Sequence, residues 1–244
     1  MNSGEPLPDA VVRYAAHEDG LIDVHLPTGP GPHPLVVYVH GGFWKQEWDR
    51  RHARPLCAAL AAEGYVVASP EYRRVGGGGG WPTTLEDVDA AVAAVPSLLA
   101  GLGVRTTRTS YVGHSAGGHL VLWLADQGHP VDRVVGLAPV GDLRAAARDG
   151  LGDDATQALL GGGPDDVPER YAAADPAQRL SPDTPGDLVV LHGLDDDVVP
   201  VDNSRGLVAR HPEVRLRELA DTDHFAVIDP QSKAFEALLG TLAP

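Results

Sequence analysis

Residues 109–125 read TSYVGHSAGGHLVLWLA, and this stretch decides the fold. TSYV is an apolar run typical of a strand, and AGGHLVLWLA has the length and composition of a helix. Between them, GHSAG fits the G-x-S-x-G pattern of a nucleophile elbow, a sharp turn from a strand into a helix. The flanking glycines allow this turn without Cβ clashes, so we expect Ser115 to be strained and exposed at the edge of a sheet. A glycine-rich helix start with a capping serine is the alternative.

Similar apolar runs recur along the chain, and from residue 35 onward they alternate with longer helical patterns. The expected strands are Val11–Tyr14, Leu21–His25, Leu35–His40, Tyr65–Ser69, Ser110–Gly113, Val134–Leu137, Leu188–His192 and Val214–Leu219, and the expected helices are Arg51–Glu63, Thr84–Leu99, Ala116–Gln127, Ser204–His211 and Gln231–Leu242. This alternation predicts an α/β fold with a doubly wound, mostly parallel eight-stranded sheet flanked by helices. The first two strands lack a helix between them, so we expect an antiparallel hairpin at one edge.

We expect a single domain over residues 1–244, because neither a repeat nor a linker marks a second one. One segment interrupts the alternation. Residues 142–187, rich in Asp, Gly, Pro and Ala, separate two expected strands and are too long for an ordinary connection. We predict that this segment is a small cap or lid insertion of short helices. It would lie over the edge of the sheet where open α/β folds bind ligands.

Composition excludes several classes of protein. The chain has 244 residues and a formal net charge of −15, from 19 Lys and Arg against 34 Asp and Glu. Such a surface repels phosphate backbones, so we expect no nucleic-acid partner and no attraction to anionic membranes. No apolar run approaches the roughly 20 residues of a membrane span, and the start, MNSGEPLPDA, does not resemble a signal peptide. With Cys57 as the sole cysteine, a reduced cytoplasmic location is expected.

A serine hydroxyl needs a base to act as a nucleophile at neutral pH, and the base needs an acid to orient it. His224 follows the last expected strand and precedes the last helix, which suits a base for Ser115. Residues 192–200 read HGLDDDVVP after the strand LVVL, so the acid is one of the adjacent aspartates at 195–197. The order Ser, Asp, His is that of α/β-hydrolase triads. A solvent-exposed loop histidine is the alternative for His224.

Residues 40–44 read HGGFW and directly follow the strand LVVYV. Two glycines let backbone N–H groups turn toward a ligand, as an oxyanion hole requires. We expect the donors to be the N–H groups of Gly42 and Phe43 together with that of Ala116. A tight turn with a core tryptophan is the alternative. Since no HExxH, CxxC or similar spacing occurs, we expect neither a metal nor an organic cofactor.

Together, HGGFW, EYRR with WPTTLEDV, GHSAGGHL, HGLDDDVVP and DHFAVIDP resemble the motifs of the α/β-hydrolase superfamily. Within it, the chain is similar to the esterase and kynurenine-formamidase-like group, which uses HGG-x-W. The resemblance covers nearly the whole chain from about residue 21. It implies Ser115 as the nucleophile, His224 as the base and Asp196 as the acid, because the acid is the fifth residue of the H-G-x-x-D-x-x-V-P pattern.

The leading hypothesis is a serine hydrolase that cleaves small ester or amide bonds through an acyl-enzyme, as a carboxylesterase or an arylformamidase. Trp44, Trp81 and Arg73 are candidates for the substrate pocket, the last to bind a substrate carboxylate, although core and surface roles fit them equally well. A small aminopeptidase-like or acylpeptide hydrolase is an alternative, and a non-catalytic hydrolase-fold binding protein is a more distant one. We expect a small-molecule substrate as partner, and a homodimer is possible.

Overall fold

A computed structural model describes residues 6–243 of the chain. Residues 1–5 and Pro244 lie outside the described residues. Residues 1–5 are half of the N-terminal segment that the sequence analysis expects not to be a signal peptide. The described strands are β1 (Ala10–Arg13), β2 (Leu21–His25), β3 (His33–Val39), β4 (Val66–Pro70), β5 (Thr106–His114), β6 (Arg133–Leu137), β7 (Asp187–Gly193) and β8 (Arg215–Leu219). Each overlaps one of the strands predicted from the sequence.

The strands form one eight-stranded sheet within residues 6–243, in the order β1-β2-β4-β3-β5-β6-β7-β8. Strands β3 to β8 run parallel to one another, and the hairpin of β1 and β2 is antiparallel at one edge. The predicted fold class, a doubly wound and mostly parallel sheet flanked by helices, is therefore confirmed. Since strands buried on both faces need apolar side chains on both, runs such as LVVYV in β3 explain this architecture.

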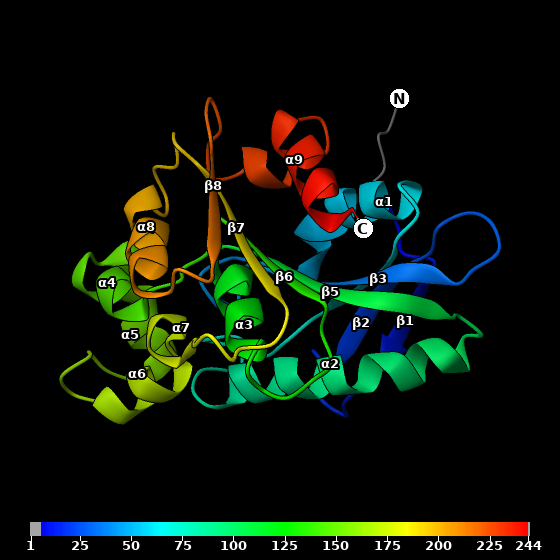
Figure 1. The fold of residues 1–244 in the computed structure, drawn as a ribbon. Coiled ribbons are helices and arrows are strands. Elements are labelled where there is room, and N and C mark those ends of the chain that lie inside the picture. The colour runs from blue at the N-terminus through cyan, green and yellow to red at the C-terminus, as the bar shows by residue number, and fades with distance from the viewer. Residues whose placement is uncertain (1–5, 244) are drawn as a thin grey trace.

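Helices cover both faces of the sheet (Figure 1). The described helices are η1 (Arg50–Ala53), α1 (Arg54–Ala62), α2 (Thr83–Gly101), α3 (Ala116–Leu124), α4 (Leu143–Arg148), α5 (Leu151–Leu160), α6 (Pro168–Ala174), α7 (Pro176–Arg179), α8 (Val201–Arg210), η2 (Ala226–Ile228) and α9 (Lys233–Leu242). One core cluster joins α2, α3 and α8 to the sheet, and a second joins α1 and α9 to its other face. None of the helices within residues 6–243 combines the length and apolar character needed to cross a membrane.

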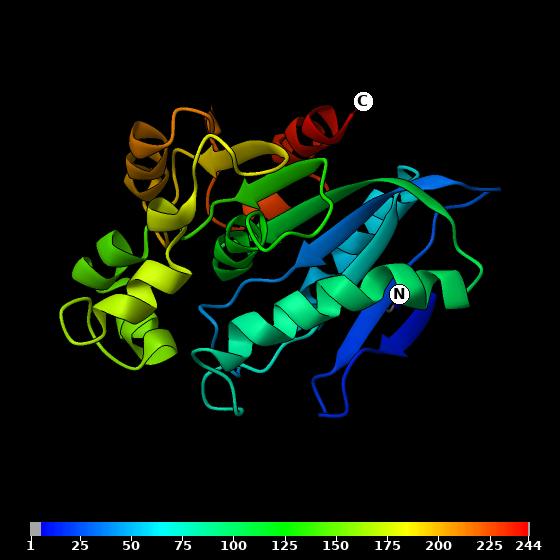
Figure 2. The ribbon, with the colours of Figure 1, turned by 60° about the horizontal axis from the view of Figure 1, so that its bottom comes forward.

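The segment predicted as an insertion, residues 142–187, contains the short helices α4 to α7 between β6 and β7. Figures 1 and 2 show these helices gathered at the end of the molecule opposite the β1–β2 hairpin. They pack against α3, where Ala174 O lies 2.9 Å from Nε2 of His119 and Ala173 O accepts a hydrogen bond from Trp123.

The pairing of the strands brings the ends of β3, β5, β6, β7 and β8 to one edge of the sheet. Val39 pairs with Gly113, Leu137 with Leu191, and Gly193 with Leu219. The loops that carry HGGFW, the elbow, the aspartates and His224 all leave the sheet at this edge. The order of the strands therefore places chemically reactive side chains together that lie far apart in the sequence.

Candidate active site

Ser115 occupies the sharp turn between β5 and α3 that the G-x-S-x-G pattern predicts. Its φ of 54° and ψ of −116° are rarely adopted by a residue with a Cβ, so the turn is strained, as expected. Ser115 is only 2% exposed, however, so the expectation of an exposed serine is wrong. Strand and helix approach so closely that a Cβ on Gly113 would lie 2.1 Å from the carbonyl oxygen of Gly117. The N–H of Ser115 donates to Leu137 O on the neighbouring strand at 2.9 Å, which ties the turn to the sheet.

His224 and Asp196 meet beside this turn. Nδ1 of His224 lies 2.7 Å from Oδ2 of Asp196, and both side chains are buried. A carboxylate can only accept, so Nδ1 carries the proton and Nε2 is left with a lone pair, as a general base requires. The other carboxylate oxygen accepts the N–H groups of Val198 and Val199 at 2.9 and 2.8 Å.

The environment of Asp196 keeps its carboxyl group ionised. Burial by itself would raise the pKa of Asp196, but hydrogen bonds from His192 and His224 hold that pKa below its usual value. Of the three aspartates that the sequence left open, Asp195 and Asp197 are exposed, and Asp196 faces the histidine. This geometry agrees with the position that the family pattern implies.

Ser115 and His224 open onto the same cavity, which has a volume of about 130 Å³. The lining is almost entirely apolar and aromatic. Its residues are Gly42, Phe43, Trp48, His52, His114, Ser115, Val198, His224, Phe225 and Ile228. The volume is below the roughly 300–1,000 Å³ of sites for drug-sized ligands, so the cavity suits a small group.

Of the three residues expected to supply oxyanion donors, Gly42 and Phe43 line this cavity, and Ala116 directly follows Ser115. Within residues 6–243, the N–H groups of Gly42, Phe43 and Ala116 have no hydrogen-bond partner, which leaves them available to a ligand. Gly42 has a φ of 109°, and a Cβ there would lie 2.3 Å from Cβ of Trp48. Only glycine fits this position, because both its backbone angle and its contact with Trp48 exclude a side chain.

The structure places the three predicted pocket residues elsewhere, so that prediction is corrected. Trp44 is fully buried, and its ring lies in the core, edge-on to His119. Trp81 packs against the same core cluster and is not among the lining residues. Arg73 donates Nε and Nη2 to the carboxylate of Asp87 at 2.8 and 2.7 Å. This ion pair occupies two of the guanidinium nitrogens, and Arg73 is not among the residues that line the cavity.

Two further histidines line the pocket, and the sequence analysis assigned neither of them to it. His114, beside Ser115, directs its ring to the His224 loop, where its Nε2 lies 2.9 Å from His224 O. His52 reaches the cavity from η1. Burial lowers the pKa of both rings, in His52 to about 4, so neither brings a positive charge to the pocket at neutral pH. No motif includes His52, and only the fold reveals its position.

The segment of residues 142–187 contributes no residue to the lining of this cavity. One of its residues, Gly152 at the start of α5, packs against Phe43, where a Cβ on Gly152 would lie 2.6 Å from the ring. The segment therefore reaches the site through the ring of an expected oxyanion residue. Within residues 6–243, no group of three or more His, Cys, Asp or Glu side chains is placed to hold a metal ion.

Comparison with known proteins identifies the family. The BD-FAE family model matches residues 22–210, which is most of the chain. The chain belongs to the BD-FAE family. It is 30% identical over 224 residues to Esterase LipC of Mycobacterium tuberculosis, covering 82% of this chain and 54% of that protein. It is 32% identical over 113 residues to kynurenine formamidase of Danio rerio, covering 45% of this chain and 36% of that protein. This BD-FAE family member spans about half the length or less of these curated relatives.

Solved structures with the same fold include esterases. A truncated carbohydrate esterase from gut microbiota superposes with a TM-score of 0.83 at 20% identity, over 98% of this chain and 96% of that one. Esterase B from Lactobacillus rhamnosis gives 0.80 at 20% identity, over 98% and 86%. These structures confirm the fold of this BD-FAE family member, and the family model and the esterase and formamidase relatives confirm the resemblance inferred from its sequence.

The lowered pKa of His52 predicts an acid-sensitive stability. The unfolded chain binds a proton at this ring as pH falls through about 6.5, whereas the folded protein does so only near pH 4. Between these values the free energy of unfolding should therefore fall with pH, with up to about 3 kcal/mol from His52. Urea unfolding at pH 7 and pH 4.5 should show that the free energy of unfolding falls less between these pH values in His52→Gln than in the wild type. A loss equal to that of the wild type would contradict this assignment.

Proposed function

We propose that this protein is a serine hydrolase that cleaves small, uncharged carboxylic esters through an acyl-enzyme. One observation carries the proposal. Ser115, on a strained turn, shares a small apolar cavity with His224, and Nδ1 of His224 lies 2.7 Å from Oδ2 of Asp196. The esterase relatives and the esterase fold support a hydrolase of this type.

In the proposed mechanism, Ser115 attacks the ester carbonyl while Nε2 of His224 takes the hydroxyl proton. Asp196 stabilises the positive charge that then develops on the ring. The N–H groups of Gly42, Phe43 and Ala116 bind the oxyanion of the tetrahedral intermediate. His224 returns the proton to the leaving alcohol. In the second half of the reaction, His224 takes a proton from the water that attacks the acyl-enzyme and then returns a proton to Ser115 as the acid leaves.

The charges around the cavity favour this substrate class over an arylformamide with a carboxylate. None of the cavity's lining residues is Lys or Arg. Arg73 is paired with Asp87, and Arg74 is 2% exposed and bonded to Glu71 and Asp19. An anionic substrate would have to lose its hydration without gaining a partner, which is costly. The match to kynurenine formamidase therefore supports the reaction type more than a shared substrate.

Replacing the nucleophile tests the reaction. Ser115→Ala should lower kcat for p-nitrophenyl acetate by about 10³-fold or more, because the remaining groups can only bind and polarise the ester. Ser97→Ala, a change of the same kind at an exposed position of α2, is the control and should leave the rate unchanged. Retention of more than a few per cent of the rate in Ser115→Ala would show that another group performs the reaction.

The three neighbouring aspartates allow a matched test of the acid. Asp196→Asn should lower kcat by about 10³–10⁴-fold, because an amide no longer fixes the ring tautomer or stabilises its charged form. Asp195→Asn and Asp197→Asn remove the same charge from exposed side chains and should change kcat less than about threefold. Equal losses in all three variants would mean that net charge, and not the contact with His224, governs the rate.

The uncharged lining predicts discrimination between acyl groups of equal length. p-Nitrophenyl butyrate and mono-p-nitrophenyl succinate both carry four acyl carbons, and they differ by one terminal carboxylate. Burial of that carboxylate without a partner should lower kcat/KM for the succinate ester by about 100-fold or more. Similar kcat/KM values for the two esters, at both low and high salt, would contradict the proposed substrate class.

A further inference from the structure

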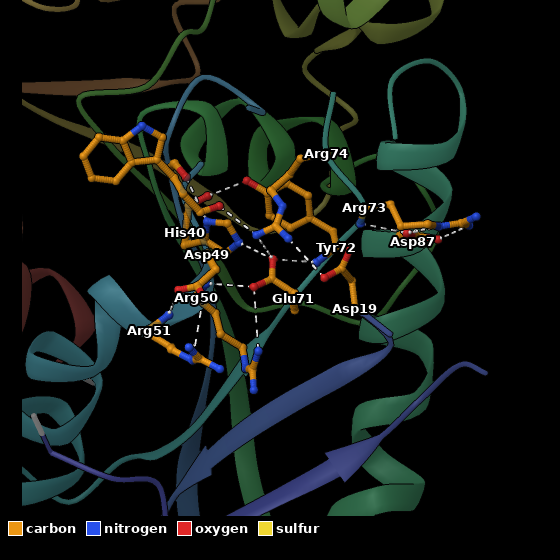
Figure 3. A network of polar contacts seen from close by, with 12 residues as sticks. Asp19, His40, Asp49, Arg50, Arg51, Glu71, Tyr72, Arg73, Arg74 and Asp87 are labelled. Atoms are coloured by element: carbon orange, nitrogen blue, oxygen red, sulfur yellow. Dashed lines mark hydrogen bonds and ion pairs between the residues drawn. The ribbon is translucent and has the colours of Figure 1, made fainter. Parts of the chain in front are cut away.

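A buried group of charged side chains lies behind the loop HGGFW, with Glu71 at its centre (Figure 3). Glu71 follows β4 and is 1% exposed. Its Oε1 lies 2.8 Å from Nε2 of His40 and 2.8 Å from Nη1 of Arg74, and its Oε2 accepts the N–H of Arg50 at 2.9 Å. Neither Glu71 nor His40 is among the residues that line the cavity, so neither is placed to contact a substrate directly.

His40 joins this carboxylate to the backbone of the loop. Its second ring nitrogen, Nδ1, lies 2.8 Å from the carbonyl oxygen of Gly41. Carboxylate and carbonyl oxygens can only accept, so both contacts are hydrogen bonds when both ring nitrogens carry a proton. Tyr72 fixes the ring further by stacking on it at 4.4 Å and by donating its hydroxyl to His40 O at 2.9 Å.

The contact with Gly41 sets the direction of an expected oxyanion donor. The carbonyl of Gly41 and the N–H of Gly42 belong to one peptide group, which is planar and trans, so they point in opposite directions. A hydrogen bond that holds the carbonyl toward His40 therefore holds the Gly42 N–H on the opposite side. Between two glycines the peptide would otherwise rotate easily, because glycine adopts both signs of φ.

We propose that Glu71 and His40 are positioning residues that aim the Gly42 N–H at the oxyanion. This inference rests on the proposed hydrolase function and deepens it. Glu71 orients His40, and His40 holds the Gly41 carbonyl. The arrangement parallels the one in which Asp196 orients His224, but here the imidazole holds a peptide group and transfers no proton to the substrate.

The surroundings of Glu71 are consistent with this role. Burial would raise its pKa, but the charge and hydrogen bond of His40, with Arg74 and the Arg50 N–H, lower that pKa to about 2. Arg74 also donates to Trp48 O at 2.7 Å, and Trp48 packs against Gly42. The same carboxylate thus supports the loop at His40 and again at residues 48–50.

The expected kinetic signature is a loss in kcat and not in substrate binding, since an oxyanion forms only along the reaction path. Glu71→Gln should lower kcat for p-nitrophenyl acetate roughly 10- to 100-fold with KM within about threefold, as expected for one misdirected donor. The inhibition constant of a trifluoromethyl ketone, which forms an oxyanion when bound, should rise by a similar factor. Glu86→Gln, an exposed change of the same kind on α2, is the control. A kcat within twofold of the wild type in Glu71→Gln would overturn the proposal.

A pair of His40 variants tests the order of the contacts. The amide of His40→Asn lies near the position of Nδ1 and keeps a donor for the Gly41 carbonyl, whereas that of His40→Gln lies near Nε2 and keeps the contact with Glu71. His40→Asn should therefore retain at least about tenfold more kcat than His40→Gln. In the His40→Gln background, adding Glu71→Gln should lower kcat by less than about threefold, because residues that act in series are not additive. Equal activities of the two His40 variants, or multiplying losses in the double variant, would contradict the relay.

These measurements separate the two proposals. A wild-type protein without turnover of p-nitrophenyl acetate, or a fully active Ser115→Ala, would refute the hydrolase function itself. An active wild type with an inactive Ser115→Ala and an unaffected Glu71→Gln would refute only the positioning role. Thermal unfolding of each variant shows which proteins are folded, and if Glu71→Gln does not fold, the two His40 variants still decide the question.

Discussion

The site depends on one backbone turn that the surrounding structure holds in a strained conformation. At φ 54° and ψ −116°, Ser115 stores roughly 1–3 kcal/mol that a relaxed loop would release. The turn persists because β5 and α3 meet across Gly113 and Gly117 with no space for a Cβ. Hydrogen bonds from the Ser115 N–H to Leu137 O and from the Val140 N–H to Ser115 O fix it from the end of β6 and from the loop that follows. The parallel sheet thus determines where the hydroxyl points.

Two carboxylate–imidazole pairs flank this turn, and we propose that they perform related tasks. Asp196 and His224 arrive on the loops after β7 and β8 and face the cavity. Glu71 and His40 lie on the opposite side, after β4 and β3, and face a peptide group. In each pair the carboxylate lies against one ring nitrogen and so fixes the orientation of the ring. Nε2 of His224 is left to accept a proton, whereas Nδ1 of His40 faces a carbonyl, to which it donates when both nitrogens of that ring carry a proton.

Much of the fold was predictable, because buried parallel strands need apolar residues on both faces and this leaves an unambiguous pattern. The residues at the strand ends followed from motif and order, as at Ser115 and His224. The identity of the residues that line the cavity did not follow from motif or order. Trp44 lies in the core although the adjacent Phe43 lines the cavity, and Arg73 is held by Asp87, 14 positions away in the sequence. His52 reaches the cavity from η1, a segment that no motif marks and whose position only the packed structure determines.

The central claim is that the fold makes the hydroxyl of Ser115 unusually reactive, and covalent labelling measures this most directly. Treatment of the wild-type protein with a fluorophosphonate, followed by peptide mapping in a mass spectrometer, should place a single adduct on Ser115. The adduct should form far more slowly when His224 is replaced by Ala, because the hydroxyl then lacks its base. An unlabelled protein, or an adduct at another serine, would contradict the account.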